Sequence, residues 1–172
     1  QKKRGCLEQS SIKVYSGQLL DSHLPGDSFD LIRLEHVFEH LLEPIRILRE
    51  LHRLLKPGGI LVMNFPSINA ISFDFSPLHC AHRDSPRHLY LHTMRSAQNM
   101  LTNSGFKIAK ARQYGVVLVL QATINNFLKE RGIKLTVRWL RILGPLYNAY
   151  CVLVRRGENI TVLALKEGET VA

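Results

Sequence analysis

Short apolar runs in the first part of the chain predict β-strands. Residues 28–34 form a nearly continuous apolar run after a Pro-Gly-Asp turn, which is typical of a buried parallel strand. Arg33 lies within this run and would need a partner there, because a buried charge is costly. Residues 60–65 form a second such run. A weaker alternation of apolar and polar residues over 12–15, which ends at Gly17, predicts another short strand.

An apolar pattern with the period of an α-helix lies between the two stronger strands. Its residues share one helix face: Leu41, Ile45, Leu48, Leu51 and Leu55. We expect this helix to begin near Leu42, with Pro44 in its first turn and an ion pair between Arg46 and Glu50 on its exposed side. The sequence Lys56-Pro57-Gly58-Gly59 should end it, with glycine supplying a left-handed cap.

The second half of the chain repeats this alternation and adds an insertion. Thr93 is a candidate N-cap for a helix that ends at Gly105, and the apolar face of that helix carries Met94, Ala97 and Leu101. Strands are expected at 106–112 and 160–165, and the residues between them, 116–156, read as a helical insertion. Alternating strands and helices indicate an α/β fold with a parallel sheet.

The composition is typical of one globular domain, and the net charge is positive. The 172 residues carry 23 Lys+Arg against 14 Asp+Glu, and the resulting net charge of +9 favours an anionic partner. The three cysteines are far apart in the sequence, which indicates reduced thiols: Cys6, Cys80 and Cys151. We expect a cytoplasmic protein, because no apolar segment of a signal peptide follows the basic N-terminal residues. The chain starts without Met and within an element, so we expect an N-terminal truncation.

An ordered series of motifs resembles the small-molecule branch of the class I S-adenosylmethionine-dependent methyltransferases. The motifs are Gly17-Gln18-Leu19, Leu24-Pro25, residues 28–32, His36-Val37-Phe38-Glu39-His40-Leu41, Arg53-Leu54-Leu55-Lys56-Pro57-Gly58-Gly59, Asn64-Phe65-Pro66-Ser67, Pro86-Arg87-His88-Leu89-Tyr90 and Gly105-Phe106. Their order and spacing match the family over residues 10–112, and the strand at 160–166 closes the series.

The resemblance implies a Rossmann-like sheet that lacks its first strands, with residues 1–172 forming one truncated domain and a helical insertion before the last strand. Enzymes of this family bind the cofactor with a Gly-rich turn after their first strand and an acidic residue at the end of the second. This chain contains neither, and residues 1–11 look like the end of the helix that follows the second strand. We therefore expect the fragment alone to bind S-adenosylmethionine poorly and to be inactive.

The resemblance also implies a set of cofactor-binding residues. Gly17, Gln18 and Leu19 would pack on the adenine, where the family often has an acidic residue at the position of Gln18; the alternative is an ordinary turn. Leu34, Glu35 and His36 would border the methionine part of the cofactor. These three residues follow a strand, and ligands of open α/β sheets bind beyond the carboxyl ends of the strands.

Candidate catalytic and substrate-binding residues lie in the same region and in the segment after Pro86. His40 or Glu39 could accept a proton from an acceptor hydroxyl, and His88 is the next candidate. The alternative is that Glu39 and His40 cap the following helix. Arg87 and His92 would contact the substrate, because the resemblance places their segment over the mouth of the active site.

Two further features allow more than one interpretation. A cluster of potential ligands invites a zinc site, but its spacing matches no closed zinc signature and we expect no metal there: His79, Cys80, His82, His88 and His92. Residues 133–156 combine apolar and aromatic residues with arginines, and Gly144-Pro145 interrupts them, so they cannot form one membrane span. They could lie on an anionic membrane surface, on the inner membrane face, or form a lid over the domain.

The expected function is transfer of a methyl group from S-adenosylmethionine to an oxygen or nitrogen nucleophile of a small-molecule, lipid-linked or glycan-linked acceptor. The main alternative is a non-catalytic binding or membrane-adaptor domain with a degraded methyltransferase fold. Modification of nucleic acid is disfavoured, because no basic strip interleaved with aromatic residues is present. Hydride transfer on a dinucleotide would leave the Glu-His and Pro-Arg-His-Leu motifs unexplained.

Overall fold

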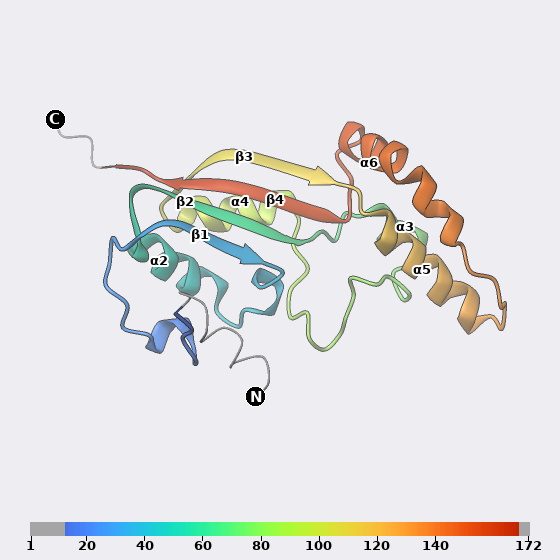
Figure 1. The fold of residues 1–172 in the computed structure, drawn as a ribbon, viewed down its shortest axis with the longest axis horizontal. Helices are drawn as coiled ribbons and strands as arrows, with labels where there is room; N and C mark the ends of the chain where they lie inside the picture. The colour runs from blue at the N-terminus through green and yellow to red at the C-terminus, as the bar shows by residue number, and fades with distance from the viewer. Residues whose placement is uncertain (1–12, 169–172) are drawn as a thin grey trace.

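The computed structural model describes residues 13–168, which form a four-stranded sheet with helices on one face and at one end (Figure 1). The strands are β1 (Phe29–Glu35), β2 (Leu55–Pro66), β3 (Phe106–Tyr114) and β4 (Asn159–Lys166), in the order β1-β2-β4-β3. The four strongest strand predictions are confirmed. Only β1 and β2 are parallel, however, because β4 enters between β2 and β3 and runs antiparallel to both.

Two helices cover the same face of the sheet and enclose the core. They are α2 (Pro44–Leu54) and α4 (Met94–Asn103). The largest buried side chains between helices and sheet include Phe38, Leu48, Leu61, Met63, Phe65, Leu101 and Ile160. The predicted N-cap of α4 is confirmed, since Thr93 and Ser96 each accept a hydrogen bond from the other's backbone in a capping box.

The details of α2 correct the prediction. Its buried residues are Leu48, Leu51 and Leu54, whereas Ile45 is 41% exposed. The helix ends at Leu54 because Leu55 already pairs with β1 as the first residue of β2. Gly58 has a left-handed φ of 78°, but it lies within β2 at a shift of register and caps no helix.

Charged residues of α2 also pair differently from the prediction. Arg46 contacts Glu43 and Arg53 contacts Glu50, both at i,i+3, so the predicted pair between Arg46 and Glu50 is wrong. Both pairs are on the surface, where such contacts contribute little to stability.

The edge of the sheet at β1 is more exposed than the sequence predicts. None of the β1 residues is buried, and Leu31 is 55% exposed. Arg33 is therefore at the surface, where it pairs with Glu35. The predicted strand at 12–15 is wrong for residues 13–15, which have no regular structure, and Ile12 lies outside the described residues. A strand requires a hydrogen-bonded neighbouring strand, and none of the four strands within 13–168 pairs with this segment.

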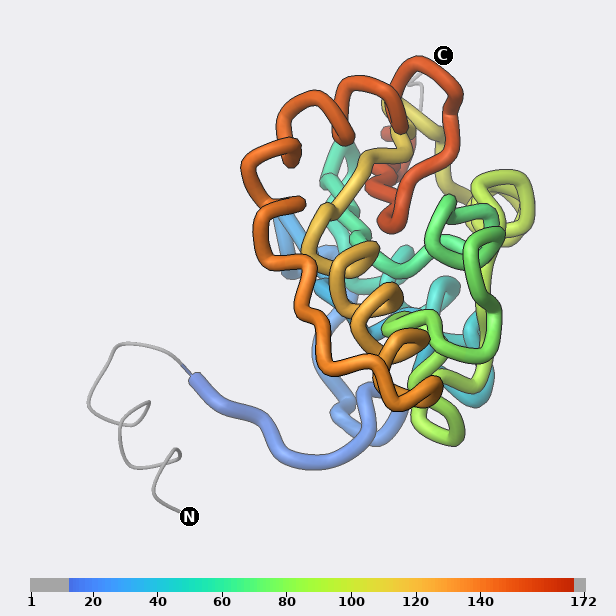
Figure 2. The backbone as a smooth tube through the Cα atoms, turned by 90° about the vertical axis from the view of Figure 1, so that its right-hand side faces the viewer, coloured from blue at the N-terminus to red at the C-terminus, as the bar shows by residue number. Residues whose placement is uncertain are grey.

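The insertion is helical, as predicted, and lies beyond the carboxyl ends of β1, β2 and β3. It contains α5 (Val117–Glu130), a 3₁₀ helix η3 (Arg138–Leu143) and α6 (Gly144–Leu153), and α5 also contacts the short helix α3 (Ile71–Phe75). Figure 2 views the molecule from this end, where the insertion and the loop before α4 both face the viewer. Among the helices of residues 13–168, none has the length and hydrophobicity of a membrane-spanning segment.

Candidate functional site

A cavity of about 500 Å³ lies between the outer side of β1, helix α2 and the 3₁₀ helix η1 (Leu19–Asp21). Its lining is mostly apolar and includes Gln18, Leu19, Ile32, Leu34, Val37, His40, Leu41 and Leu51. Four residues expected at the active site are thus brought together: Gln18, Leu19, Leu34 and His40. Gly17 precedes them with a left-handed φ of 119°, which favours glycine. Such a volume, largely apolar with a few polar groups, is typical of a small-molecule site.

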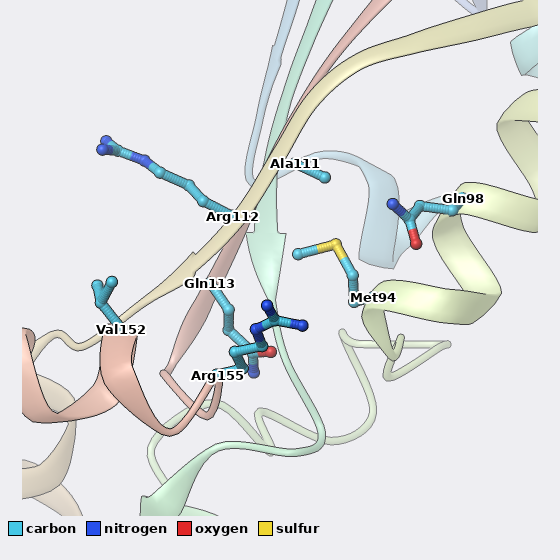
Figure 3. Close-up of a pocket in the computed structure, with 7 residues that line it drawn as sticks. All are labelled: Met94, Gln98, Ala111, Arg112, Gln113, Val152 and Arg155. Carbon is cyan, nitrogen blue, oxygen red and sulfur yellow. The ribbon is translucent and has the colours of Figure 1, made fainter.

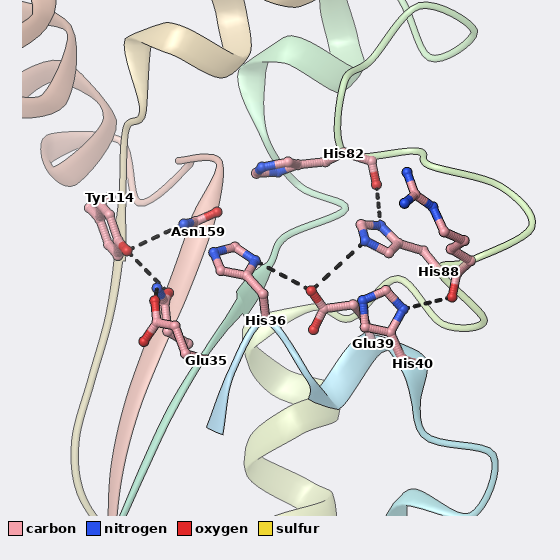
Figure 4. Close-up of polar contacts among 10 residues, drawn as sticks. Glu35, His36, Glu39, His40, His82, His88, Tyr114 and Asn159 are labelled. Atoms are coloured by element: carbon pink, nitrogen blue, oxygen red, sulfur yellow. Dashed lines mark hydrogen bonds and ion pairs between the residues drawn. The ribbon is translucent and has the colours of Figure 1, made fainter. Parts of the chain in front are cut away.

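Polar side chains from all four strands form a chain of hydrogen bonds at the carboxyl end of β1 (Figure 4). Asn64 donates to Glu35 Oε1 at 2.6 Å, and Tyr114 donates to Asn64 Oδ1 at 3.1 Å. Asn159 in turn donates to the Tyr114 hydroxyl at 3.3 Å. The hydrogen bond from Asn64, aided by Arg33, holds the pKa of Glu35 below its usual range, so this carboxylate stays charged.

A left-handed turn after β1 directs Glu39 into the protein. His36 has a φ of 50° and its amide donates to the Asn64 carbonyl. The next residues form a 3₁₀ helix, η2 (Phe38–His40), in which the Glu39 side chain is 1% exposed. His36 Nδ1 lies 3.3 Å from Glu39 Oε1, but no residue within 13–168 forms a hydrogen bond to either carboxylate oxygen.

His88 reaches the same place from the loop that precedes α4. The amides of Leu89 and Tyr90 both donate to the Glu39 carbonyl, at 2.9 and 3.2 Å, and hold this loop against η2. His88 Nε2 then lies 3.9 Å from Glu39 Oε1, and the His88 and His40 rings are 4.9 Å apart (Figure 4). All three candidate catalytic residues therefore lie together, although they come from two distant segments.

The helix-capping alternative for Glu39 and His40 is wrong. The N-cap of α2 is Glu43, three residues beyond His40, and no side chain caps this end of the helix. Neither Glu39 nor His40 has a capping contact: Glu39 points into the protein and His40 borders the cavity.

The two expected substrate-binding residues differ in their positions. The Arg87 side chain is 75% exposed and pairs with Asp84, while its carbonyl accepts a hydrogen bond from His40 Nδ1. His92 is 5% exposed and stacks on Phe38 at 4.4 Å within the core. Burial lowers the pKa of His92 to about 4, so its imidazole is neutral at physiological pH.

The other potential ligands near position 80 do not converge. His79 contacts Glu130 of α5, and Cys80 is a buried free thiol near Ser72. Burial, together with nearby His36 and His88, lowers the pKa of His82 to about 4. Within the described residues, only His88 of this cluster joins other metal-ligand side chains.

A second cavity, of about 530 Å³, lies on the far side of the sheet from β1 (Figure 3). It is lined by Met94 and Gln98 of α4, by residues of β3 and by Val152 and Arg155. Its Gln113 side chain already donates to Ser67 and to the Gly157 carbonyl. None of its lining residues is shared with the cavity beside β1.

The structure has an open α/β fold of the Rossmann-like methyltransferase type. A family model described as methyltransferase domain matches residues 1–63. One curated relative, an uncharacterized 37.1 kDa protein in transposon TN4556 of Streptomyces fradiae, is 31% identical over 78 residues, which are 45% of this chain and 23% of that protein.

The chain is also similar in fold to several solved structures. The chain is similar to a possible histamine N-methyltransferase from Thermotoga maritima, with 13% identity, a TM-score of 0.63 and coverage of 96% of this chain and 69% of that one. It is similar to an S-adenosylmethionine-dependent methyltransferase from Mesorhizobium loti, with 18% identity, a TM-score of 0.55 and coverage of 94% and 73%. It is also similar to the [4+2]-cyclase SpnF, with 19% identity, a TM-score of 0.58 and coverage of 97% and 59%.

The chain matches the methyltransferase-domain family over residues 1–63 and shares the fold of S-adenosylmethionine-dependent methyltransferases. It spans 23% of the length of its curated relative and 59% of the cyclase.

The sequence does not predict three members of the hydrogen-bonded chain that begins at Glu35: Asn64, Tyr114 and Asn159. A usable signal was present, because Asn64 and Tyr114 lie near the carboxyl ends of strands, and Asn159 begins the antiparallel strand between them.

Proposed function

We propose that the full-length protein transfers a methyl group from S-adenosylmethionine to an oxygen or nitrogen nucleophile of a small-molecule acceptor. The observation that supports this most is the gathering of Glu39, His40 and His88 beside the apolar cavity at the carboxyl end of β1. The cofactor supplies an electrophilic methyl group on a sulfonium. Catalysis then depends mainly on placing the acceptor in line with it, and a hydroxyl acceptor also needs a base.

The residues of the cavity fit the cofactor in chemical character. Gln18 and Leu19 at its rim would hold the adenine, since an amide can both donate to and accept from its edge. Leu34, Glu35 and His36, at the end of β1, would border the methionine part. We assign His40 as the group that takes the acceptor proton, with Glu39 and His88 beside it and Arg87 at the mouth.

Replacement of Gln18 by alanine in the full-length protein is expected to weaken S-adenosylmethionine binding about tenfold, the effect of losing one hydrogen bond of about 1.4 kcal/mol. Titration calorimetry measures this, and transfer of a labelled methyl group to an acceptor measures the activity. Gln98→Ala is the matched control, because Gln98 lines the other cavity and its loss should leave affinity unchanged. If only Gln98→Ala weakened binding, the cofactor would belong to the cavity beside α4.

A second candidate role is attachment of the insertion to an anionic membrane surface, which would suit a lipid-linked or glycan-linked acceptor. The observation that favours it is the exposure of large apolar side chains on η3 and α6: Trp139 at 59%, Ile142 at 81%, Leu146 at 70% and Leu153 at 81%. Arg138 precedes Trp139 in the sequence, whereas Arg155 lines the second cavity. Arg141 and Arg156 are held by Gln121 and by Asp74.

Anionic vesicles are expected to shift the emission of Trp139, the only tryptophan, to the blue, because its ring would leave water for the lipid interface. Each basic residue near such a surface contributes about 1 kcal/mol, so added salt should weaken the effect. Neutral vesicles should shift the emission much less. Equal spectra with and without anionic vesicles would assign the insertion to covering the domain instead.

A further inference from the structure

Three potential metal ligands from two segments converge at η2. One ligand atom each from Glu39, His40 and His88 lies within 4.8 Å of the others, and Glu39 Oε1 is 3.9 Å from His88 Nε2 (Figure 4). Two imidazoles and one carboxylate form a common ligand set of zinc and of other divalent transition metals.

The Glu39 carboxylate is buried beside histidines, with His36 Nδ1 at 3.3 Å and His88 Nε2 at 3.9 Å from its Oε1. Its side chain is 1% exposed, and neither oxygen accepts a hydrogen bond from residues 13–168. A buried carboxylate with no hydrogen-bond partner strongly destabilises a fold unless a positive charge compensates it. The carboxylate faces histidine nitrogens, so a bound cation between them would satisfy all three groups.

Both histidines are oriented as metal ligands usually are. His40 Nδ1 lies 2.7 Å from the Arg87 carbonyl, and His88 Nδ1 lies 2.6 Å from the His82 carbonyl. A carbonyl only accepts hydrogen bonds, so each Nδ1 carries the proton and each Nε2 keeps a free lone pair. Carbonyl contacts of this kind fix the tautomer and ring orientation of metal-binding histidines.

We infer that Glu39, His40 and His88 bind one divalent transition-metal ion, with coordination positions left open toward the end of β1. Ligand atoms of a tetrahedral zinc site are about 3.3 Å apart, which follows from bonds of about 2 Å. Small side-chain rotations would therefore close the observed arrangement around an ion. Binding of the ion does not depend on the proposed methyl transfer. The effect of the ion on catalysis rests on the proposed function, because a metal ion beside the acceptor would favour the deprotonated form of an acceptor hydroxyl.

The test is a titration of chelator-treated full-length protein with Zn²⁺ or Co²⁺, without cofactor or acceptor. We expect one ion per chain by calorimetry, a visible absorption band with Co²⁺, and a rise of about 5 °C in the unfolding temperature at saturating metal. Glu39→Gln and His88→Ala should each weaken binding by about tenfold or more. Glu43→Gln and His23→Ala are matched controls, because both residues are exposed, and they should bind as the wild type does.

Glu39→Gln also separates metal binding from a purely structural role. In the presence of chelator this variant should unfold at the same or a higher temperature than wild type. Glutamine keeps the shape of the side chain and removes a buried negative charge that accepts no hydrogen bond from residues 13–168. With metal, wild type should become the more stable of the two. The inference is overturned if neither ion stabilises wild type, or if Glu39→Gln binds the ion as tightly as wild type does. Neither result would bear on cofactor binding, which is measured separately.

Discussion

Replacement of Gly157 by alanine is expected to destabilise the protein by about 3 kcal/mol, at the upper end of the usual cost of overpacking. A Cβ atom at this position would overlap the backbone carbonyl of Tyr114, the last residue of β3. Backbone atoms cannot yield as a flexible side chain can, so the turn into β4 would have to move away from β3. The Gly157 carbonyl also accepts a hydrogen bond from the buried Gln113, which such a movement would break.

For a domain of this size, the loss corresponds to a fall of about 9 °C in unfolding temperature, measured by calorimetry or circular dichroism. Gly168→Ala is the matched control, since its Cβ would meet only Pro57 at 3.9 Å, an ordinary contact. If Gly157→Ala were as stable as wild type, the backbone at Gly157 could move away from Tyr114 without a cost in stability, which would contradict this prediction. The sequence gives no indication of this effect, because the contact joins Gly157 to Tyr114 on a segment distant along the chain.

The elements that local patterns determine were predicted, and those that depend on distant partners were not. The strands at 28–34, 60–65, 106–112 and 160–165 and the Thr93 cap carry strong local signals, and the structure contains them all. The helix end at Leu54 was misjudged because pairing of Leu55 with β1 overrides the pattern that continues the helix face.

In the candidate site, too, some residue positions follow from the sequence and others depend on distant contacts. Placement of Glu39 and His40 after β1 follows from the order of elements along the chain. The position of His88 depends on the hydrogen bonds from Leu89 and Tyr90 to the Glu39 carbonyl, and backbone contacts between distant segments leave no periodic signature. The histidines and the cysteine near position 80 belong to one loop, whereas the convergent set joins one residue of that loop to two residues of η2.

If the proposed methyl transfer is correct, His40→Ala in the full-length protein is expected to lower the turnover number by about a hundredfold or more, which is the usual contribution of a positioned general base. His40 borders the cavity, and its Nδ1 is held by the Arg87 carbonyl, so its Nε2 is free to accept a proton. Cofactor affinity should remain nearly intact, because the rest of the lining is unchanged. Steady-state rates and a cofactor titration measure the two quantities separately, with His23→Ala as the exposed-histidine control.

Chelator treatment then separates the two ways in which His40 could act. If it accepts the proton directly, chelator-treated wild type keeps its activity and only the variant is slow. If it acts by holding a metal ion, the chelator slows wild type to the rate of the variant, and added Zn²⁺ or Co²⁺ restores only wild type. Unchanged turnover of His40→Ala would exclude both roles and would leave His88, 3.9 Å from Glu39 through its Nε2, as the base.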